Sequence, residues 1–216
     1  MKQTLTRTTL LALLSLGLAQ SASAELLTFT NNYAAWQTAA GAVKTVDFET
    51  LPNGATSTAG TPISASFNFT AQGVTLSSRT NDITINGNPI GGFGIHAGSP
   101  FGNDPTNIRA DLVGARNAFG IFFPGGTTLS VYDKNGNLLG TNSFSSGGDN
   151  FFMGFVSDTP IAYAISERRY GNYVSSSEYW QAVTFSASPV PEPETYAMLG
   201  LGLLLLTGAR KLRRRN

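Results

Sequence analysis

Apolar and polar residues alternate in short runs along most of the chain. In the run 44–50, for example, the apolar Val46 and Phe48 alternate with the acidic Asp47 and Glu49. Such alternation predicts a β-strand with one buried face, because successive side chains of a strand point to opposite sides. Further strands are predicted at residues 64–72, 74–78, 82–87, 117–123, 127–133, 137–144, 151–157, 160–168 and 178–188.

Turn-forming residues separate these runs. Asn135-Gly136 lies between the runs 127–133 and 137–144, and an Asn-Gly pair in this position is a strong hairpin signal. The segment 86–107 is rich in Gly, Pro and Asn and has no alternation. It is therefore expected to form an unusually long loop.

One stretch has a helical pattern, the alanine-rich segment that Thr30 or Asn31 would cap and that ends near Gly41. Many short strands with almost no helix indicate an all-β domain, and the absence of a fixed repeat length disfavours a propeller or solenoid. We therefore predict a jelly-roll-like β-sandwich. A signal helix would precede it, and a short apolar helix would follow it.

The N-terminus has the organisation of a secretory signal peptide. Lys2 and Arg7 come before an apolar run over 10–18, and the small residues Ala22 and Ala24 frame the expected cleavage site after residue 24. A retained membrane helix is the alternative, but it needs about 20 apolar residues. We expect residues 1–24 to be the signal peptide and residues 25–188 to be the β-sandwich domain.

Charge and cysteine content narrow the function of this domain. The whole chain has a formal charge of +1, whereas residues 25–188 hold seven basic and eleven acidic residues, a net charge of −4. An acidic, sparsely charged domain argues against nucleic-acid binding, which requires a basic face. The chain has no cysteine, which excludes disulfides, thiol catalysis and cysteine-bound metals.

The C-terminal segment 189–216 has three parts. A Val190-Pro191-Glu192-Pro193 motif is followed by an apolar stretch over 196–209 and a basic end. As a helix the stretch would span about 21 Å, short of a hydrocarbon core of about 30 Å. It would hold the protein at the inner membrane as a temporary transmembrane helix, with the basic end on the cytoplasmic side. The basic residues are Arg210, Lys211, Arg213, Arg214 and Arg215.

This three-part tail resembles a PEP-CTERM sorting signal. The resemblance implies that an exosortase, a membrane transpeptidase-like protease, processes the tail near its Pro-Glu-Pro motif in a bacterium with an outer membrane and an exopolysaccharide system. The pieces VDFETLPNG, AQGVTLSS, NAFGIFF, LSVYDKNGNLLGT and FFMGFVSDTPIAYAIS resemble the β-sandwich domains found in front of such tails. Those domains imply a surface or biofilm-matrix location and generally no defined activity.

Two acidic side chains are candidates for a structural calcium site. Asp47 and Glu49 are two residues apart on one predicted strand and should share a face, and Asp104 or Glu178 could add oxygen ligands. The alternative is an ordinary solvated face. The last strand of the resembling domains often carries an Asp-Asp pair, which the stretch 181–185 lacks. No other cofactor is expected.

Aromatic side chains suggest a second candidate site, for sugars. Tyr170, Tyr173 and Trp180 lie close together in the sequence, and flat aromatic faces flanked by polar groups suit sugar rings. The alternative places Trp180 in the core and the tyrosines in ordinary loops.

Catalytic patterns are few. His96 is the only histidine, so metal sites that need several histidines are excluded. It is expected in a loop, and the sequence has no G-x-S-x-G motif that would support a serine triad. We expect a non-catalytic exported protein associated with exopolysaccharide. The alternative is a lyase or glycosidase, which could use Asp104 and Asp111.

Overall fold

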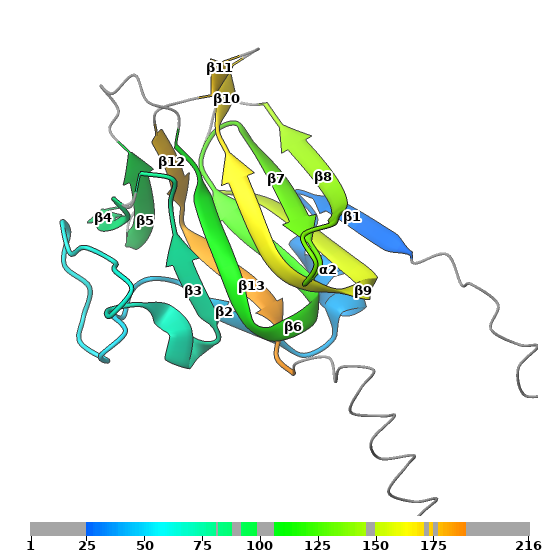
Figure 1. Cartoon of the computed structure of the whole chain (residues 1–216), viewed down its shortest axis with the longest axis horizontal. Helices are drawn as coiled ribbons and strands as arrows, with labels where there is room; N and C mark the ends of the chain where they lie inside the picture. Colours follow the sequence, from blue (N-terminus) through cyan, green and yellow to red (C-terminus); the bar gives the residue numbers. More distant parts are fainter. Residues whose placement is uncertain are drawn as a thin grey trace, which may run out of the picture.

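The computed structural model describes residues 25–80, 82–87, 92–98, 106–145, 150–170, 173–174 and 177–188 (Figure 1). Strands dominate, as predicted. The elements are β1 (Leu26–Thr30), α2 (Tyr33–Ala40), β2 (Val43–Val46), the 3-10 helix η1 (Phe69–Gln72), β3 (Val74–Ser77), β4 (Thr84–Gly87), β5 (Phe93–Gly98), β6 (Ile108–Phe123), β7 (Thr127–Tyr132), β8 (Leu138–Phe144), β9 (Phe151–Glu167), β10 (Arg169–Tyr170), β11 (Tyr173–Val174), β12 (Ser177–Trp180) and β13 (Ala182–Ser186).

Two long antiparallel strands, β6 and β9, connect two layers of sheet. Their pairing shifts register between Asp111 and Ala118, which divides both strands into two halves. In layer A the first half of β6 pairs with β3 and the second half of β9 pairs with β7, which pairs in turn with β8. In layer B the first half of β9 pairs with β1 and the second half of β6 pairs with β13, which pairs in turn with β2. Figure 1 shows β6 and β9 running side by side through the middle of the molecule.

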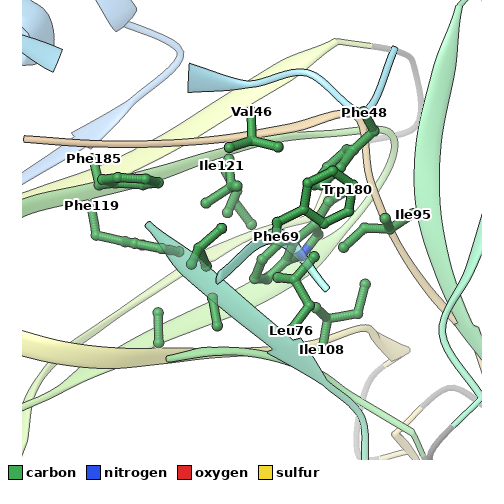
Figure 2. Packing of buried hydrophobic residues seen from close by; sticks show 14 of the residues in the cluster. Val46, Phe48, Phe69, Leu76, Ile95, Ile108, Phe119, Ile121, Trp180 and Phe185 are labelled. Atoms are coloured by element: carbon green, nitrogen blue, oxygen red, sulfur yellow. The ribbon is translucent and has the colours of Figure 1, made fainter. Parts of the chain in front are cut away.

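The two layers enclose one apolar core. At one edge they meet directly, because Asn142 Nδ2 on β8 donates to Thr30 Oγ1 on β1 at 2.8 Å. Figure 2 shows Phe48, Phe69 and Trp180 close together in the core, and the rings of Phe48 and Phe69 lie 5.3 Å apart. This arrangement is the jelly-roll-like sandwich expected from the alternation. Core side chains from the two layers include Val74, Leu76, Ile108, Leu129, Val131, Phe119, Ile121, Met153, Phe155, Val183 and Phe185.

Helix α2 covers the outer face of layer B with a second, smaller core. Trp36 is fully buried, packs against Phe152, and donates from its indole Nε1 to the carbonyl of Phe155 at 3.0 Å. The helix is capped by Asn32, whose Oδ1 accepts from the Ala35 amide at 3.2 Å. The sequence had suggested Thr30 or Asn31 as the cap. Layer A has no such helix among the described elements, and its outer face carries the polar side chains of its strands.

A three-stranded sheet, β12-β5-β4, closes one end of the core. It contributes Ile85, Ile95 and Trp180, each fully buried. The chain then passes through Gln181, whose amide donates to the carbonyl of Phe122, into β13 of layer B. The predicted strand 178–188 is therefore two strands in different sheets.

Three other predicted elements differ from the structure. β5 lies inside the segment 86–107, which the sequence had suggested was a loop, because its pattern is interrupted by glycines. Residues 64–72 form turns and η1 rather than a strand, and Asn68 caps η1 by accepting from the Phe69 amide. The predicted strands 151–157 and 160–168 are one continuous strand, β9, despite Pro160 between them.

The first predicted strand ends early. β2 stops at Val46, and Phe48 has a φ of 62°, in the left-handed region. Val46 and Phe48 are nevertheless both buried, while Asp47 and Glu49 are exposed. The alternation correctly predicted which side chains enter the core, although the backbone turns where a strand was expected.

Candidate functional site

The outer face of layer A presents polar side chains in three rows across its strands. One row contains Asp111, Tyr163 and Tyr132, which are register partners on β6, β9 and β7. The next row contains Arg109, Ile165, Ser130 and Thr141 in the same order, ending on β8, and the third contains Glu167, Thr128 and Ser143. The period of two in each strand produces this face, since the alternate positions point into the core.

A shallow hollow of about 570 Å³ lies on this face. Its lining combines the half-buried apolar side chain of Ile165 with hydroxyl groups from β7 and β8. The lining is made of Arg79, Asn107, Thr128, Ser130, Tyr132, Thr141, Ser143, Ile165 and Glu167.

Hydroxyl groups meet in two cross-strand pairs in this hollow. Thr128 Oγ1 and Ser143 Oγ are 3.0 Å apart, and Ser130 Oγ and Thr141 Oγ1 are also 3.0 Å apart. Each pair uses one O–H as donor and leaves the second O–H and further lone pairs available. The hollow therefore offers donors and acceptors at fixed positions.

A stacked ridge of three side chains borders the hollow. The rings of Tyr132 and Tyr163 are nearly parallel, 9° apart, with centroids separated by 4.7 Å. The guanidinium carbon of Arg109 lies 3.8 Å from the centroid of the Tyr163 ring. Arg109 also donates from Nη2 to Asp111 Oδ1 at 2.6 Å, and this hydrogen bond raises the pKa of Arg109 above its usual value. The ridge is thus fixed from both ends by stacking and an ion pair.

A second ion pair lies at the other end of the hollow. Arg79 Nη2 is 2.9 Å from Glu167 Oε1, and the Arg79 amide donates to Asn107 Oδ1 at 2.9 Å. The Arg79 side chain is about half exposed, at 49%, whereas that of Glu167 is 18% exposed. This pair connects the turn after β3 to the end of β9.

Behind this face, a carboxyl group is buried in the core. Glu178 is 1% exposed, and its Oε1 accepts from Thr127 Oγ1 at 2.9 Å and from Ser166 Oγ at 3.0 Å. Burial raises the pKa of Glu178 to about 7, although these hydrogen bonds and the charge of Arg168 lower it. Among the described residues, its second oxygen, Oε2, has no hydrogen-bond partner.

The predicted sugar-binding aromatics have different outcomes. Trp180 is fully buried and its Nε1 donates to Ser166 Oγ at 2.7 Å, so the expectation that it contacts a glycan is wrong. It is the core residue of the alternative interpretation. Tyr170 and Tyr173 are backbone partners in the hairpin β10-β11, and their side chains lie outside the described structure. Their role stays a prediction.

The predicted calcium ligands are bound to backbone amides. Asp47 Oδ1 accepts from the Glu49 amide at 3.1 Å, and Glu49 Oε1 accepts from the Phe93 amide at 2.8 Å. Glu178 is bound within the core, and Asp104 lies outside the described residues. Within the part of the chain that is described, no three His, Cys, Asp or Glu side chains gather as a metal site would require.

His96 does not line the hollow, and Asp111 lies on the same face beside it, next to Tyr163. His96 is on β5 rather than in a loop, half-buried beside Tyr179, and burial lowers its pKa below the usual value. Burial raises the pKa of Tyr179 to about 12. Asp111 is held by Arg109, and Asp104 is not described.

Sequence reasoning missed the residues of the hollow. Their signal was present, because Thr128, Ser130 and Tyr132 alternate with Leu129 and Val131 in the predicted strand 127–133. The pattern identifies such residues as outward-facing. It does not show which strands stand beside each other, and therefore does not show that they share one surface.

Comparison with known proteins identifies the C-terminal segment. Residues 189–215 match the model of the PEP-CTERM protein-sorting motif. The motif, Ala22 and Ala24 of the predicted cleavage site, and the apolar stretch 196–209 lie outside the described residues. In the described part of the chain, no helix has the length and apolar character needed to cross a membrane.

Similarity to other proteins is weak outside this segment. No curated protein matches the chain. A mutant of the lectin binding domain of lectinolysin, complexed with Lewis b, is 11% identical and has a TM-score of 0.33, covering 44% of this chain and 72% of that chain. The enzymatically active domain of bacteriophage CBA120 tailspike protein 4 is 15% identical and has a TM-score of 0.29. The match covers 52% of this chain and 19% of the tailspike chain. Neither similarity bears on the function of this chain.

Fold and motif together define the class of the protein: a β-sandwich with a C-terminal sorting signal. The chain carries a PEP-CTERM sorting motif at residues 189–215, which implies export to the cell envelope or surface and processing by an exosortase.

Proposed function

We propose that this protein is a non-catalytic component of the cell surface or extracellular matrix that binds exopolysaccharide through the hollow of layer A. The observation that carries the proposal is the pair of cross-strand hydroxyl contacts beside Ile165. A sugar ring has hydroxyl groups around its edge and C–H groups on its faces. The hollow offers partners for both.

The hydroxyl pairs suit a glycan because they can both donate and accept. When a sugar hydroxyl binds the Ser130–Thr141 pair, it can accept the remaining O–H and donate to a lone pair of the same pair. Hydrogen bonds of this kind each contribute about 0.5–1.5 kcal/mol. Binding at one hollow would therefore be weak, as suits a polymer that presents many repeats.

The stacked ridge supports the proposal because it is already ordered. Arg109, Tyr163 and Tyr132 are held by an ion pair and by ring stacking before any ligand arrives. Little side-chain entropy is then lost on binding. An exposed, preformed polar surface with aromatic side chains is expected of a recognition site rather than of a purely structural sheet.

A binding role also agrees with the ionic contacts of the face. The Asp111 carboxylate accepts from Arg109, and the Glu167 carboxylate accepts from Arg79. Carboxylates that act as catalytic acid or nucleophile need to reach the substrate. Here they hold neighbouring side chains, which supports recognition without catalysis.

The sorting motif supports the location. Exosortase processing would free the domain from the inner membrane, where residues 196–209 hold it temporarily, and deliver it to the cell surface or matrix. Exopolysaccharide is the polymer that it would meet there. The domain then works as a matrix protein with an affinity for that polymer.

The test removes the hydroxyls of the hollow without changing its shape. The double variant Ser130→Ala, Thr141→Val should reduce binding to exopolysaccharide from the producing bacterium, measured by affinity electrophoresis of the purified full chain. We expect a loss of about 5- to 150-fold, because two hydrogen bonds of about 0.5–1.5 kcal/mol each are removed. Tyr132→Ala should weaken binding by a similar factor.

The chain offers a matched control. Thr45 Oγ1 and Thr184 Oγ1 form a similar cross-strand hydroxyl pair, 3.1 Å apart, on β2 and β13 of layer B. The double variant Thr45→Val, Thr184→Val should bind as the wild type does. Wild-type protein that does not bind the polysaccharide would refute the proposal, and equal binding by the hollow variant would refute this site.

A further inference from the structure

The charged groups around the hollow are arranged in balanced pairs. Arg79 contacts Glu167 with 2.9 Å between nitrogen and oxygen, and Arg109 contacts Asp111 with 2.6 Å. The described side chains of this face thus hold two guanidinium groups and two carboxylates. Their formal charges cancel.

The contacts of Arg109 leave few of its N–H groups available to an anionic ligand. Its Nε and Nη2 both donate to the Asp111 carboxylate, at 2.6–3.1 Å, and one face of the guanidinium lies against the Tyr163 ring. A carboxylate or sulfate on a ligand could bind only the N–H groups of Arg109 that Asp111 does not use. The charge of Asp111 would lie close to that ligand and repel it.

The rest of the domain adds to this repulsion. Residues 25–188 carry a net formal charge of −4. A domain with net negative charge slows the approach of a polyanion, and this effect decreases as salt rises. On the described part of this face both guanidinium groups are paired with carboxylates, and the domain as a whole carries a net negative charge.

We infer that the polysaccharide recognised by the hollow of layer A is a neutral one, built of hexoses or pentoses without carboxylate or sulfate groups. This inference rests on the proposed binding of exopolysaccharide and specifies its substrate class. The ion pairs serve as supports: Asp111 holds Arg109 against Tyr163, and Glu167 holds Arg79 at the border of the hollow.

The experiment separates exopolysaccharide of the producing bacterium into neutral and anionic fractions by anion exchange. Each fraction is immobilised, and binding of the processed protein, purified from the cell surface or medium without the basic tail, is measured at low and at moderate salt. We expect at least tenfold tighter binding to the neutral fraction at both salt concentrations. Neutral binding should change little with salt, since hydroxyl contacts are screened much less than ionic ones.

A charge variant tests the physical reason. Asp111→Asn with Glu167→Gln removes both carboxylates and leaves two guanidinium groups without their counter-charges. This variant should gain at least tenfold in affinity for the anionic fraction, and the gain should disappear at high salt. The control, Asp47→Asn with Asp158→Asn, changes the net charge equally but alters exposed acids that do not line the hollow. It should gain little.

The outcomes separate this inference from the proposed function. Tighter wild-type binding to the anionic fraction, lost in the Ser130→Ala, Thr141→Val variant, would overturn the inference and keep the binding site. No binding to either fraction would overturn the proposed function itself. Equal gains in the charge variant and its control would show that net charge, rather than the ion pairs of this face, excludes polyanions. Because the wild-type fractions decide the substrate class, the inference stays testable if a variant fails to fold.

Discussion

The indole Nε1 of Trp180 donates a 2.7 Å hydrogen bond to the hydroxyl of Ser166 inside the core. Ser166 in turn donates to Oε1 of Glu178, so β12 and the end of β9 are connected by a buried polar chain. Polar groups in a core must be paired, because an unpaired one loses its hydration without compensation. Glu178 is the member of this chain whose pairing depends on pH.

The first prediction concerns the pH dependence of stability. The pKa of Glu178 is about 7 in the folded protein, above its ordinary value of 4.5. The native state therefore binds more protons than the unfolded state between these values, and Glu178 makes stability fall as pH rises from about 4.5 to 7. Above pH 7 the loss is complete, on the order of 2–3 kcal/mol.

The variant Glu178→Gln isolates this contribution. The glutamine amide stays neutral at every pH. The free energy of unfolding of the variant minus that of the wild type should therefore rise by on the order of 2–3 kcal/mol from pH 5 to pH 8. Urea unfolding at several pH values measures the difference. Glu49→Gln, which changes an exposed carboxylate that also accepts a hydrogen bond, is the control. A constant difference between wild type and Glu178→Gln across this range would contradict the prediction.

The second prediction concerns the close packing of α2 on layer B. A Cβ on Gly154 would lie 2.6 Å from Cδ1 of Trp36 and 2.7 Å from Cζ of Phe152. Gly154→Ala should therefore destabilise the domain by about 1–3 kcal/mol, because the aromatic rings must move. Denaturant unfolding monitored by tryptophan fluorescence checks it. Gly87→Ala is the matched control, because Gly87 also lies in a strand but has open space where a Cβ would stand. This variant should change stability by less than about 0.5 kcal/mol.

The third prediction concerns Arg116, which holds the C-terminal end of β13 through hydrogen bonds. Its guanidinium donates to the carbonyls of Ser186, Ala187 and Val113 at 2.7–3.2 Å, and the residue is 6% exposed. Arg116→Ala leaves these carbonyls without their donor and should cost about 2–4 kcal/mol.

Limited proteolysis should show the effect of Arg116→Ala first at the C-terminal end of β13. Arg79→Ala removes an arginine whose side chain is half exposed, from a surface ion pair, and should cost less than about 1 kcal/mol. Equal losses of stability in the two variants would contradict the structural role of Arg116.

The fourth prediction concerns the sorting motif. Replacing Pro191, Glu192 and Pro193 by alanine should block processing, because the exosortase recognises this motif and proline keeps the residue before it extended. Intact-mass measurement should then find the C-terminal segment retained and the protein in the inner-membrane fraction. The wild type should appear at the surface or in the medium with a shortened C-terminus. A full-length wild-type chain there would contradict processing.

Local sequence patterns predicted much of the fold, with identifiable exceptions. The Asn135-Gly136 hairpin and the buried positions Leu129 and Val131 follow directly from alternation and turn chemistry. β5 was missed because its glycines weaken the alternation. Yet β5 is stable because it pairs with β4 on one side and β12 on the other. Such long-range pairing has no local signal.

The candidate site was less predictable than the fold. Tyr132 and Tyr163 are 31 positions apart in the sequence, and only the pairing of β7 with β9 stacks their rings. Sequence neighbours left Trp180 open between a sugar contact and the core, and the structure buries it on the inward face of β12. Proximity along a chain is a poor guide to a site in a sheet made of distant strands.

The sequence by itself determined the sorting signal, the all-β class and the alternation of buried and exposed positions. These depend on short-range properties: a contiguous motif, residue preferences and the period of a strand. Only the tertiary structure decided that β6 and β9 pass through both layers and that a helix covers one outer face. It also placed the polar positions of β6, β7, β8 and β9 around one hollow. The physical reason is that strand order and register are set by burial of the whole core, which no single segment contains.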